Sequence, residues 1–116
     1  MAKRKRKRVR PDPVETRAYT DAEGNVLTLR CSLSAATMRT VAREAGGRAA
    51  ASAEDAWQRR NEILFERLAV AWEIAGLPLS DQKLLLGRYR MADEQTRRWV
   101  RRTINEHVER YLPDLG

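Results

Sequence analysis

The residues of this sequence best suited to chemistry are its arginines and lysines, and the chemistry they offer is the binding of anions. Seven of the 23 basic residues lie within residues 3–10, where there is no acid, so the remaining basic residues equal the 16 acids in number. The formal charge of +7 therefore resides in the first ten residues. A basic residue that neutralises a phosphate releases a condensed counterion, which gives affinity without base specificity. The predicted phosphate-binding residues of this arm are Lys3, Arg4, Lys5, Arg6, Lys7, Arg8 and Arg10.

Arginines also gather in residues 88–102, where Asp93 and Glu94 are the only acids. A guanidinium group can form two parallel hydrogen bonds with a phosphate or a carboxylate. This stretch is therefore a candidate second contact with nucleic acid or with an acidic partner. The alternative is a solvated helix face, because Glu94 with Arg98, and Arg102 with Glu106, stand four residues apart and can pair along a helix. The candidate residues are Arg97, Arg98, Arg101 and Arg102.

Cys31 and His107 belong to the residue types most often used in nucleophilic and acid–base catalysis, and each is the only one of its type. Such chemistry needs a convergent pair of groups, and neither residue has a partner at a readable spacing. One cysteine and one histidine make neither a disulfide nor a recognisable zinc cluster. We therefore predict a buried Cys31, a packed or half-exposed His107, and a protein that is not an enzyme and carries no metal or cofactor.

Length and composition predict one small domain that follows a disordered basic arm. Residues 1–13 have no hydrophobic face and repel themselves, which is typical of disorder, whereas residues 14–116 suffice for a single core. No run approaches the ~18 apolar residues of a membrane span, and the basic start is not followed by the apolar stretch of a secretory signal. Together with the lone cysteine, these features predict a soluble cytoplasmic protein without a membrane partner.

Residues 14–33 are the region that is typical of β-structure. A turn at residues 21–25 separates two β-favouring runs, which predicts a hairpin. After the turn, apolar and polar residues alternate with a period of two, so one set faces inward and the other outward. The predicted outward residues of this strand are Thr28, Arg30 and Ser32.

Residues 53–76 form the longest helical pattern and are predicted to be a central helix. Ser52 is its expected N-cap, and Gly76 and Pro78 are its expected end. Trp57 and Trp72 belong to an apolar stripe with three- and four-residue spacing, so both are predicted core residues rather than ligand-binding aromatics.

Three further helices are predicted around the central one. Ser34 caps a helix that ends at the glycine pair 46–47, Asp81 opens a short helix with a core of three leucines at 84–86, and the last helix covers residues 94–111. The predicted fold class is mainly α (α+β), with the N-terminal hairpin packed on a three- to four-helix core.

The strand in residues 26–33, the short helix, the glycine pair and the longer helix follow one another in an order that resembles ribbon-helix-helix DNA-binding proteins. In that family, outward strand residues of a dimeric ribbon read the major groove. The resemblance covers residues 26–68 and is carried by element order more than by residue identities. The chain departs from the family in having a hairpin partner before the strand and a further segment after the second helix. The resemblance implies that Thr28, Arg30 and Ser32 contact bases.

Two hypotheses about function remain open from the sequence. In the first, this is a small intracellular nucleic-acid-binding accessory or regulatory protein, with DNA favoured over RNA, in which the arm and the arginines of the last helix contact phosphates. In the second, it is a helical protein-interaction module or subunit that forms a homodimer or docks a partner, for example through the hairpin edge. The basic tail would then serve solubility or weak attraction.

Overall fold

The computed structural model describes residues 15–46 and 53–115. The predicted disordered arm of residues 1–13 and the predicted helix cap at Ser52 lie outside these ranges. The described residues form an α+β fold, as predicted at this level. In chain order its elements are β1 (Thr16–Thr20), β2 (Val26–Arg30), α1 (Ala35–Gly46), α2 (Ala53–Leu68), β3 (Ala69–Ile74), β4 (Leu77–Leu79), α3 (Gln82–Met91), α4 (Glu94–Tyr111) and the 3-10 helix η1 (Pro113–Leu115).

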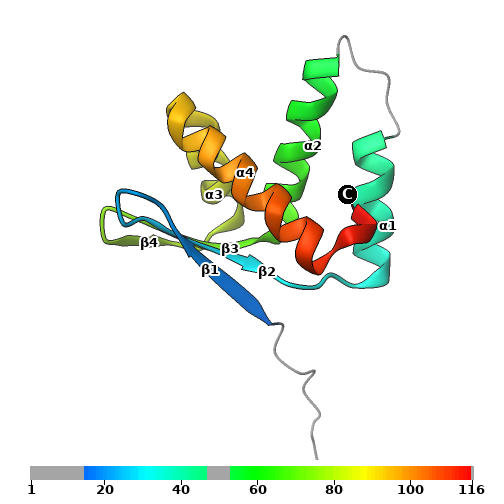
Figure 1. The fold of residues 1–116 in the computed structure, drawn as a ribbon, viewed down its shortest axis with the longest axis horizontal. Coiled ribbons are helices and arrows are strands. Elements are labelled where there is room, and N and C mark those ends of the chain that lie inside the picture. The colour runs from blue at the N-terminus through cyan, green and yellow to red at the C-terminus, as the bar shows by residue number, and fades with distance from the viewer. Residues whose placement is uncertain (1–14, 47–52, 116) are drawn as a thin grey trace, which may run out of the picture.

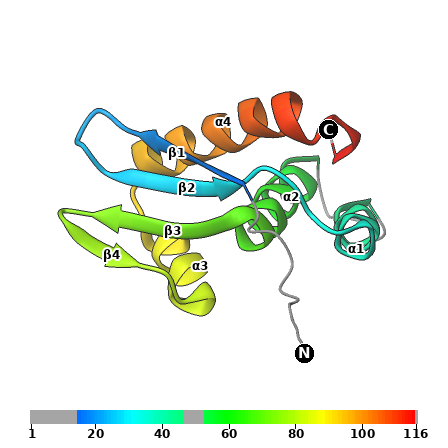
Figure 2. The ribbon, with the colours of Figure 1, turned by 90° about the horizontal axis from the view of Figure 1, so that it is seen from below.

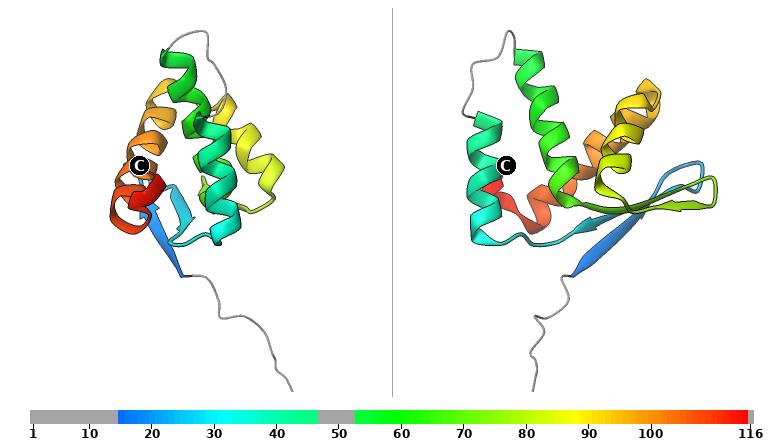
Figure 3. Two further views of the ribbon diagram at one scale, coloured as in Figure 1. Left: turned by 90° about the vertical axis from the view of Figure 1, so that its right-hand side faces the viewer. Right: turned by 180° about the vertical axis from the view of Figure 1, so that it is seen from behind.

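The sheet and the helices form two layers. The strands are antiparallel and lie side by side in the order β1-β2-β3-β4 (Figure 2). Figure 1 views the sheet nearly edge-on, with α2, α3 and α4 on one side of it, and the rear view in Figure 3 shows the same arrangement. α1 lies beside α2, beyond the end of the sheet. Among the described residues, no helix covers the opposite face of the sheet.

The predicted N-terminal hairpin is present, since β1 pairs with β2 in antiparallel register. Its turn is closed by Asp21, whose Oδ1 accepts hydrogen bonds from the backbone amides of Glu23 and Asn25 at 2.8 and 3.0 Å. Gly24 has a φ of 86°, which glycine adopts without steric cost. The hairpin is not a separate unit packed on helices, however, because β2 also pairs with β3 and so lies inside a four-stranded sheet.

The prediction of one long helix over residues 53–76 is wrong in its second half. α2 ends at Leu68 and is followed at once by β3. The chain then reverses at Ala75 and Gly76, whose φ values of 53° and 80° are both positive, as in the turns that join two hairpin strands. Gly76 is therefore left-handed in a β-turn and not at a helix end. Pro78 lies on the edge strand β4, where the lack of an amide hydrogen is tolerated.

The reason for this difference is a change of hydrophobic period. Up to Leu68 the buried side chains recur every three or four residues, whereas in β3 the inward Trp72 and Ile74 flank an exposed Glu73. A period of two buries one face of a strand, and pairing with β2 satisfies the backbone groups that a helix would have satisfied internally. Val70 and Ile74, which lie off the helical stripe in the sequence, are the local sign of this change.

The other three helices begin where the sequence predicts. At the start of α1, Ser34 Oγ accepts a hydrogen bond from the amide of Thr37 at 3.1 Å. The carboxylate of Asp81 accepts from two amides in the first turn of α3. α4 spans the predicted residues, and the Asp93 carboxylate accepts from the amide of Thr96 at 2.7 Å. These side chains satisfy amides that have no partner within the helix, which stabilises each helix start.

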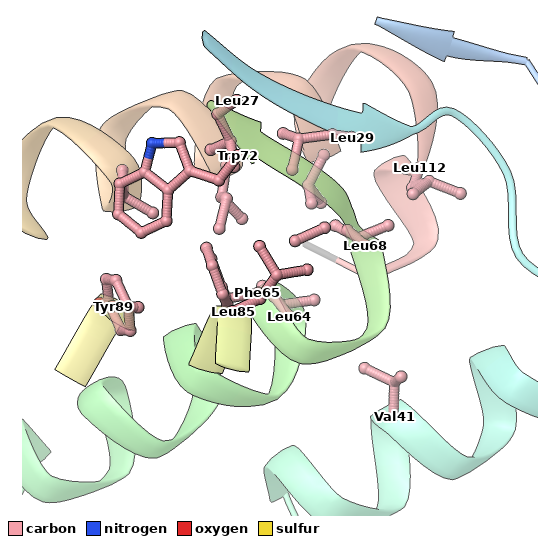
Figure 4. Packing of buried hydrophobic residues seen from close by; sticks show 14 residues of the cluster. Leu27, Leu29, Val41, Leu64, Phe65, Leu68, Trp72, Leu85, Tyr89 and Leu112 are labelled. Atoms are coloured by element: carbon pink, nitrogen blue, oxygen red, sulfur yellow. The ribbon is translucent and has the colours of Figure 1, made fainter. Parts of the chain in front are cut away.

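The core lies between the sheet and the helix layer, and Figure 4 shows its main side chains. Trp72 of β3 is 1% exposed and meets the ring of Phe65 edge-on, with 5.8 Å between ring centroids. Leu27 and Leu29 of β2 are fully buried on the same side of the sheet. The prediction that Trp72 is a core residue is confirmed, although it lies on a strand and not on a helix.

Two predicted core residues lie at the surface instead. Trp57 is 45% exposed, because it is near the start of α2, two turns before the part of this helix that contacts the sheet. Leu84 is 58% exposed, because only one side of α3 faces the core and Leu85 occupies that side. Three consecutive leucines point in different directions from a helix, so they cannot all be buried when the helix packs on one face.

Candidate nucleic-acid interface

α4 presents apolar residues on one side and arginines on another. Val100, Ile104 and Val108 are buried in the core, as the predicted stripe requires. Arg97 and Arg101 instead line a cleft that α4 forms with α2 and α3. Arg97 and Arg101 therefore face the outer parts of two other helices rather than the sheet.

Glu94, in the first turn of α4, is the common partner of three arginines. Its carboxylate oxygens lie 3.2 Å from Nη2 of Arg97, 3.7 Å from Nη2 of Arg98 and 3.2 Å from Nη2 of Arg101. The hydrogen bond from Arg101 is the main cause that holds the pKa of Glu94 below its usual value, so the carboxylate is ionised at neutral pH. The ion pair expected of a solvated face is thus present, but one carboxylate against three guanidinium groups leaves an excess of two positive charges.

Arg101 and Trp57 connect α4 to α2. The guanidinium carbon of Arg101 lies 5.0 Å from the centroid of the Trp57 ring, which is a cation–π contact. The side chain of Arg101 is only 13% exposed, whereas that of Arg98 is 67% exposed. Arg101 is therefore held between a ring and a carboxylate, and Arg98 is free to extend into solvent.

The cleft between α2, α3 and α4 has a volume of about 260 Å³. On the side opposite α4, Nη2 of Arg90 lies 2.8 Å from Oε1 of Glu62, which neutralises both charges. Tyr89 also lines the cleft. Burial raises the pKa of Tyr89, and the nearby Arg101 only partly opposes this rise, so the hydroxyl is protonated at neutral pH. The cleft thus combines an excess of positive charge, two aromatic rings and a hydroxyl group.

Arg102, the fourth predicted arginine of α4, is exposed and does not line this cleft. The basic arm joins the described chain at Glu15, just before β1. Arg17 of β1 lies over the ring of Tyr111, 5.7 Å from its centroid, at the last residue of α4. An α-helix rises about 20 Å between Arg98 and Tyr111. The point where the arm attaches and the arginines around Glu94 therefore lie near opposite ends of α4.

The residues predicted to read bases from a ribbon do not join this cluster. Thr28 and Arg30 are half-buried and alternate with residues of β2 that face the helices, so they lie on the other face of the sheet. Ser32 follows β2 and is exposed. Because β2 pairs with β1 on one side and β3 on the other, it cannot form a ribbon with a second chain. Contact of these residues with nucleic acid remains a prediction, without the ribbon geometry.

His107 is a packed histidine, as predicted, and it connects three elements. Its Nε2 lies 2.7 Å from the carbonyl oxygen of Arg30, and because a carbonyl only accepts, Nε2 carries the proton. Nδ1 then accepts from the hydroxyl of Tyr19 at 2.7 Å. Burial lowers the pKa of His107, so the neutral imidazole is the favoured form. Both ring nitrogens are engaged in holding α4 against β1 and β2.

Cys31 is buried, which confirms the prediction made from its place in the alternating strand pattern. Burial raises the pKa of its thiol above the usual value. A thiol that is both covered and protonated is a poor nucleophile. Cys31 therefore contributes to packing at the end of β2.

Sequence analysis did not predict Trp57, Tyr89 or the pair of Glu62 with Arg90 as functional residues. The spacing of Trp57 from Leu64 fits the apolar stripe of α2, and this pattern does not reveal how far along the helix the core extends. The ion pair joins residues 28 positions apart, so no local pattern marks it. The exposure of the Trp57 ring and the assembly of the cleft depend on how the helices pack together.

Comparisons of the chain with models of known protein families, with curated proteins and with solved structures found no match. Within residues 15–46 and 53–115, no three His, Cys, Asp or Glu side chains gather as a metal site would require. None of the helices in the described part of the chain is both long and apolar enough to cross a membrane. The guides to function are therefore the distribution of charge and the geometry of the cleft.

Proposed function

We propose that this protein binds nucleic acid as a small accessory or regulatory protein. The basic arm supplies electrostatic affinity for phosphates, and the arginines in the N-terminal half of α4 orient the folded body on the same ligand. The observation that carries this proposal is the distribution of charge. The whole formal excess of +7 lies in the first ten residues, and within the described residues three guanidinium groups share the single carboxylate of Glu94.

The arm supports the proposal through its sequence. Clustered lysines and arginines without intervening acids bind a polyanion by releasing its counterions, and the logarithm of the binding constant falls linearly with the logarithm of salt concentration. The arm contains no aromatic residue, so it offers no aromatic ring for base stacking, and phosphate contacts or entry into a minor groove are its natural modes.

The folded body supports the proposal through the chemistry of its arginines. Exposed ion pairs contribute little free energy, so the Glu94 carboxylate does not prevent its arginine partners from binding a phosphate. Arg98 is 67% exposed even though it pairs with Glu94. Arg102, one helical turn further along, is exposed as well. These two side chains can reach a phosphate backbone at the surface of α4.

A salt titration tests the proposal. Fluorescence anisotropy of a labelled short duplex DNA, and of a single-stranded RNA, would be measured with the full chain and with a chain that begins at Pro11. We expect the full chain to bind at about 50 mM salt and to lose most of its affinity by about 200 mM. The chain without the arm should bind more weakly and with a flatter salt dependence, because fewer counterions are released.

A full-length variant in which the seven basic residues of the arm are glutamine is the matched control, since it keeps the length and removes the charge. It should behave like the chain that begins at Pro11. If the full chain binds neither probe at about 50 mM salt, the proposal is wrong, because seven clustered charges are enough for measurable phosphate affinity.

A second candidate function is the docking of a protein, because α3 exposes large apolar side chains. Leu84 is 58% exposed and Met91 is 83% exposed, and a spacing of seven residues places them on one face of the helix. If a second copy binds this face, the chain should sediment as a dimer, and the double variant Leu84→Glu, Met91→Glu should sediment as a monomer. A monomer in both cases would rule out self-association through this face.

A further inference from the structure

We infer that the cleft between α2, α3 and α4 binds one unpaired nucleobase, with the base against Trp57 and the adjoining phosphate at Arg97 and Arg98. This inference rests on the proposed function and makes it more specific. The arm binds phosphates of any nucleic acid, whereas a cleft that accepts a base distinguishes unpaired strands from duplexes.

Trp57 has the position that a stacking ring requires. It lines the cleft and is 45% exposed, although tryptophan is usually well buried in a folded protein. The guanidinium of Arg101 lies over the ring at 5.0 Å from its centroid, so this contact occupies one face. A planar ring has two faces, and the large exposed fraction shows that the ring remains accessible. Every nucleobase has a π-face that can stack on such a ring.

Arg101 makes this ring a fixed rather than a mobile surface. Its side chain is 13% exposed, and its Nη2 donates a hydrogen bond to Oε2 of Glu94 at 3.2 Å. The ring of Trp57 is therefore held against a side chain that is itself held by α4. A preorganised aromatic surface loses less conformational freedom when a ligand binds.

The charge of the cleft suits one phosphate group beside the base. The pair of Arg90 with Glu62 is neutral, and Glu94 offsets only one of its three arginine partners. Within the described residues, Arg97 donates one hydrogen bond to Glu94, which leaves other N–H donors of its guanidinium group for a ligand. The residues that line the cleft therefore carry one net positive charge, which matches the single charge of a phosphodiester, and Arg98 lies outside the lining beside Glu94.

The size and polar lining of the cleft favour a single base. A volume of about 260 Å³ is below the range of pockets that enclose drug-sized ligands, about 300 to 1,000 Å³, so the cleft fits a small planar group. The amide of Gln58 and the protonated hydroxyl of Tyr89 line it, and both can hydrogen-bond to the edge of a base. In a duplex these base faces are covered by neighbouring pairs, so only an unpaired base can enter.

The test compares a labelled oligodeoxythymidine with a duplex of equal length, using the full chain, Trp57→Ala and Trp57→Phe. We expect Trp57→Ala to weaken binding of the single strand at least about fivefold, which is the lower end of what one stacked base contributes. Binding of the duplex should change little. Trp57→Phe keeps an aromatic face and should recover part of the single-strand affinity, which a loss of packing alone would not explain.

The outcomes separate this inference from the proposed function. If the full chain binds both probes and Trp57→Ala binds the single strand as tightly as the unsubstituted chain does, the base-binding cleft is wrong and the nucleic-acid proposal stands. If the full chain binds neither probe, both are wrong. Circular dichroism checks that each variant is folded. Should Trp57→Ala lose structure, Trp57→Leu replaces it, because leucine keeps a large apolar side chain at this position and removes the π-face.

Discussion

The two halves of α4 differ in what they contact, although they form one continuous helix. In the C-terminal half, Ile104, His107 and Val108 are almost completely buried, and His107 is bonded to both strands of the N-terminal hairpin. The N-terminal half carries the three arginines that surround Glu94, two of which, Arg97 and Arg101, line the cleft. The C-terminal half holds the helix to the hairpin, whereas the N-terminal half buries Val100 on one side and carries arginines on the other.

This difference shows what a helical pattern does and does not encode. The spacing of apolar residues determines which side of α4 is buried, and it does so along the full length of the helix. The role of the polar side depends on what lies opposite, which is solvent for Arg102 but the Trp57 ring for Arg101. Substitutions in the two regions should therefore change different properties of the protein.

The largest effect on stability is expected when the core residue Trp72 is replaced by alanine, and the matching change at Trp57 in the cleft should have a much smaller effect. Trp72→Ala removes a ring that is 1% exposed and packed on Phe65, so it should lower the free energy of unfolding by about 3 to 5 kcal/mol. Trp57→Ala removes a ring that is 45% exposed and should cost about 1 kcal/mol or less. Urea denaturation followed by circular dichroism measures both values. Equal losses would contradict the division between core and cleft.

A smaller effect is expected from protonation of His107. Burial lowers the pKa of His107 in the folded protein. At a pH just below the ordinary histidine pKa of about 6.5, the unfolded chain therefore binds more protons than the folded protein does. Stability from this residue should be complete above pH 6.5 and should be lost as the pH falls through the folded pKa. The slope for one proton is at most about 1.4 kcal/mol per pH unit. Urea denaturation at several pH values between about 7 and 5 measures it.

Two variants test whether His107 causes this pH dependence of stability. His107→Gln cannot titrate and should give a flat profile between about pH 7 and 5. Tyr19→Phe removes the hydroxyl that donates to Nδ1 but keeps a buried, titratable imidazole, so it should lower stability while the slope persists. A slope that is unchanged in His107→Gln would show that other groups cause it.

The smallest effect is expected at Glu94, in the open half of α4. Glu94→Gln removes the carboxylate shared by three arginines and should tighten binding of duplex DNA, whose bases do not enter the cleft, by about two- to fivefold, which corresponds to one exposed ion pair. Glu109→Gln, which removes an exposed carboxylate near the other end of the same helix, is the control and should have less effect. Weaker binding by Glu94→Gln would show that Glu94 orients the arginines rather than competing with the phosphate.

Much of the fold was predictable because its signals are local. The N-terminal hairpin depends on a turn that Asp21 closes with its own side chain, and α4 is bounded by Asp93 and by Pro113. The end of α2 was missed because Ala69 and Ala71 also favour a helix. This stretch is a strand because it pairs with β2, a segment some 40 residues earlier in the chain, and with β4.

The candidate site was predictable only in its charges. The arginines of α4 stand out in the sequence, and the pairing of Arg97 and Arg98 with Glu94 follows from helical spacing. The cleft itself was not predictable, because Trp57, Arg90 and Tyr89 reach it from different helices. Its assembly depends on the angles at which α2, α3 and α4 pack on the sheet, and these angles cannot be predicted from any short segment of the sequence.

The most direct test of the central claim is a double-mutant cycle between the arm and the exposed arginines of α4. Dissociation constants for a short labelled single-stranded DNA would be measured for the full chain, the chain that begins at Pro11, the full chain with Arg98→Gln and Arg102→Gln, and the chain with all these changes. Because β1, to which the arm connects, and the arginines around Glu94 lie near opposite ends of α4, we predict that each change weakens binding and that their free-energy effects add within about 0.5 kcal/mol. If the arginine substitutions leave the dissociation constant unchanged in both chains, the folded body does not contact the nucleic acid and the claim is wrong.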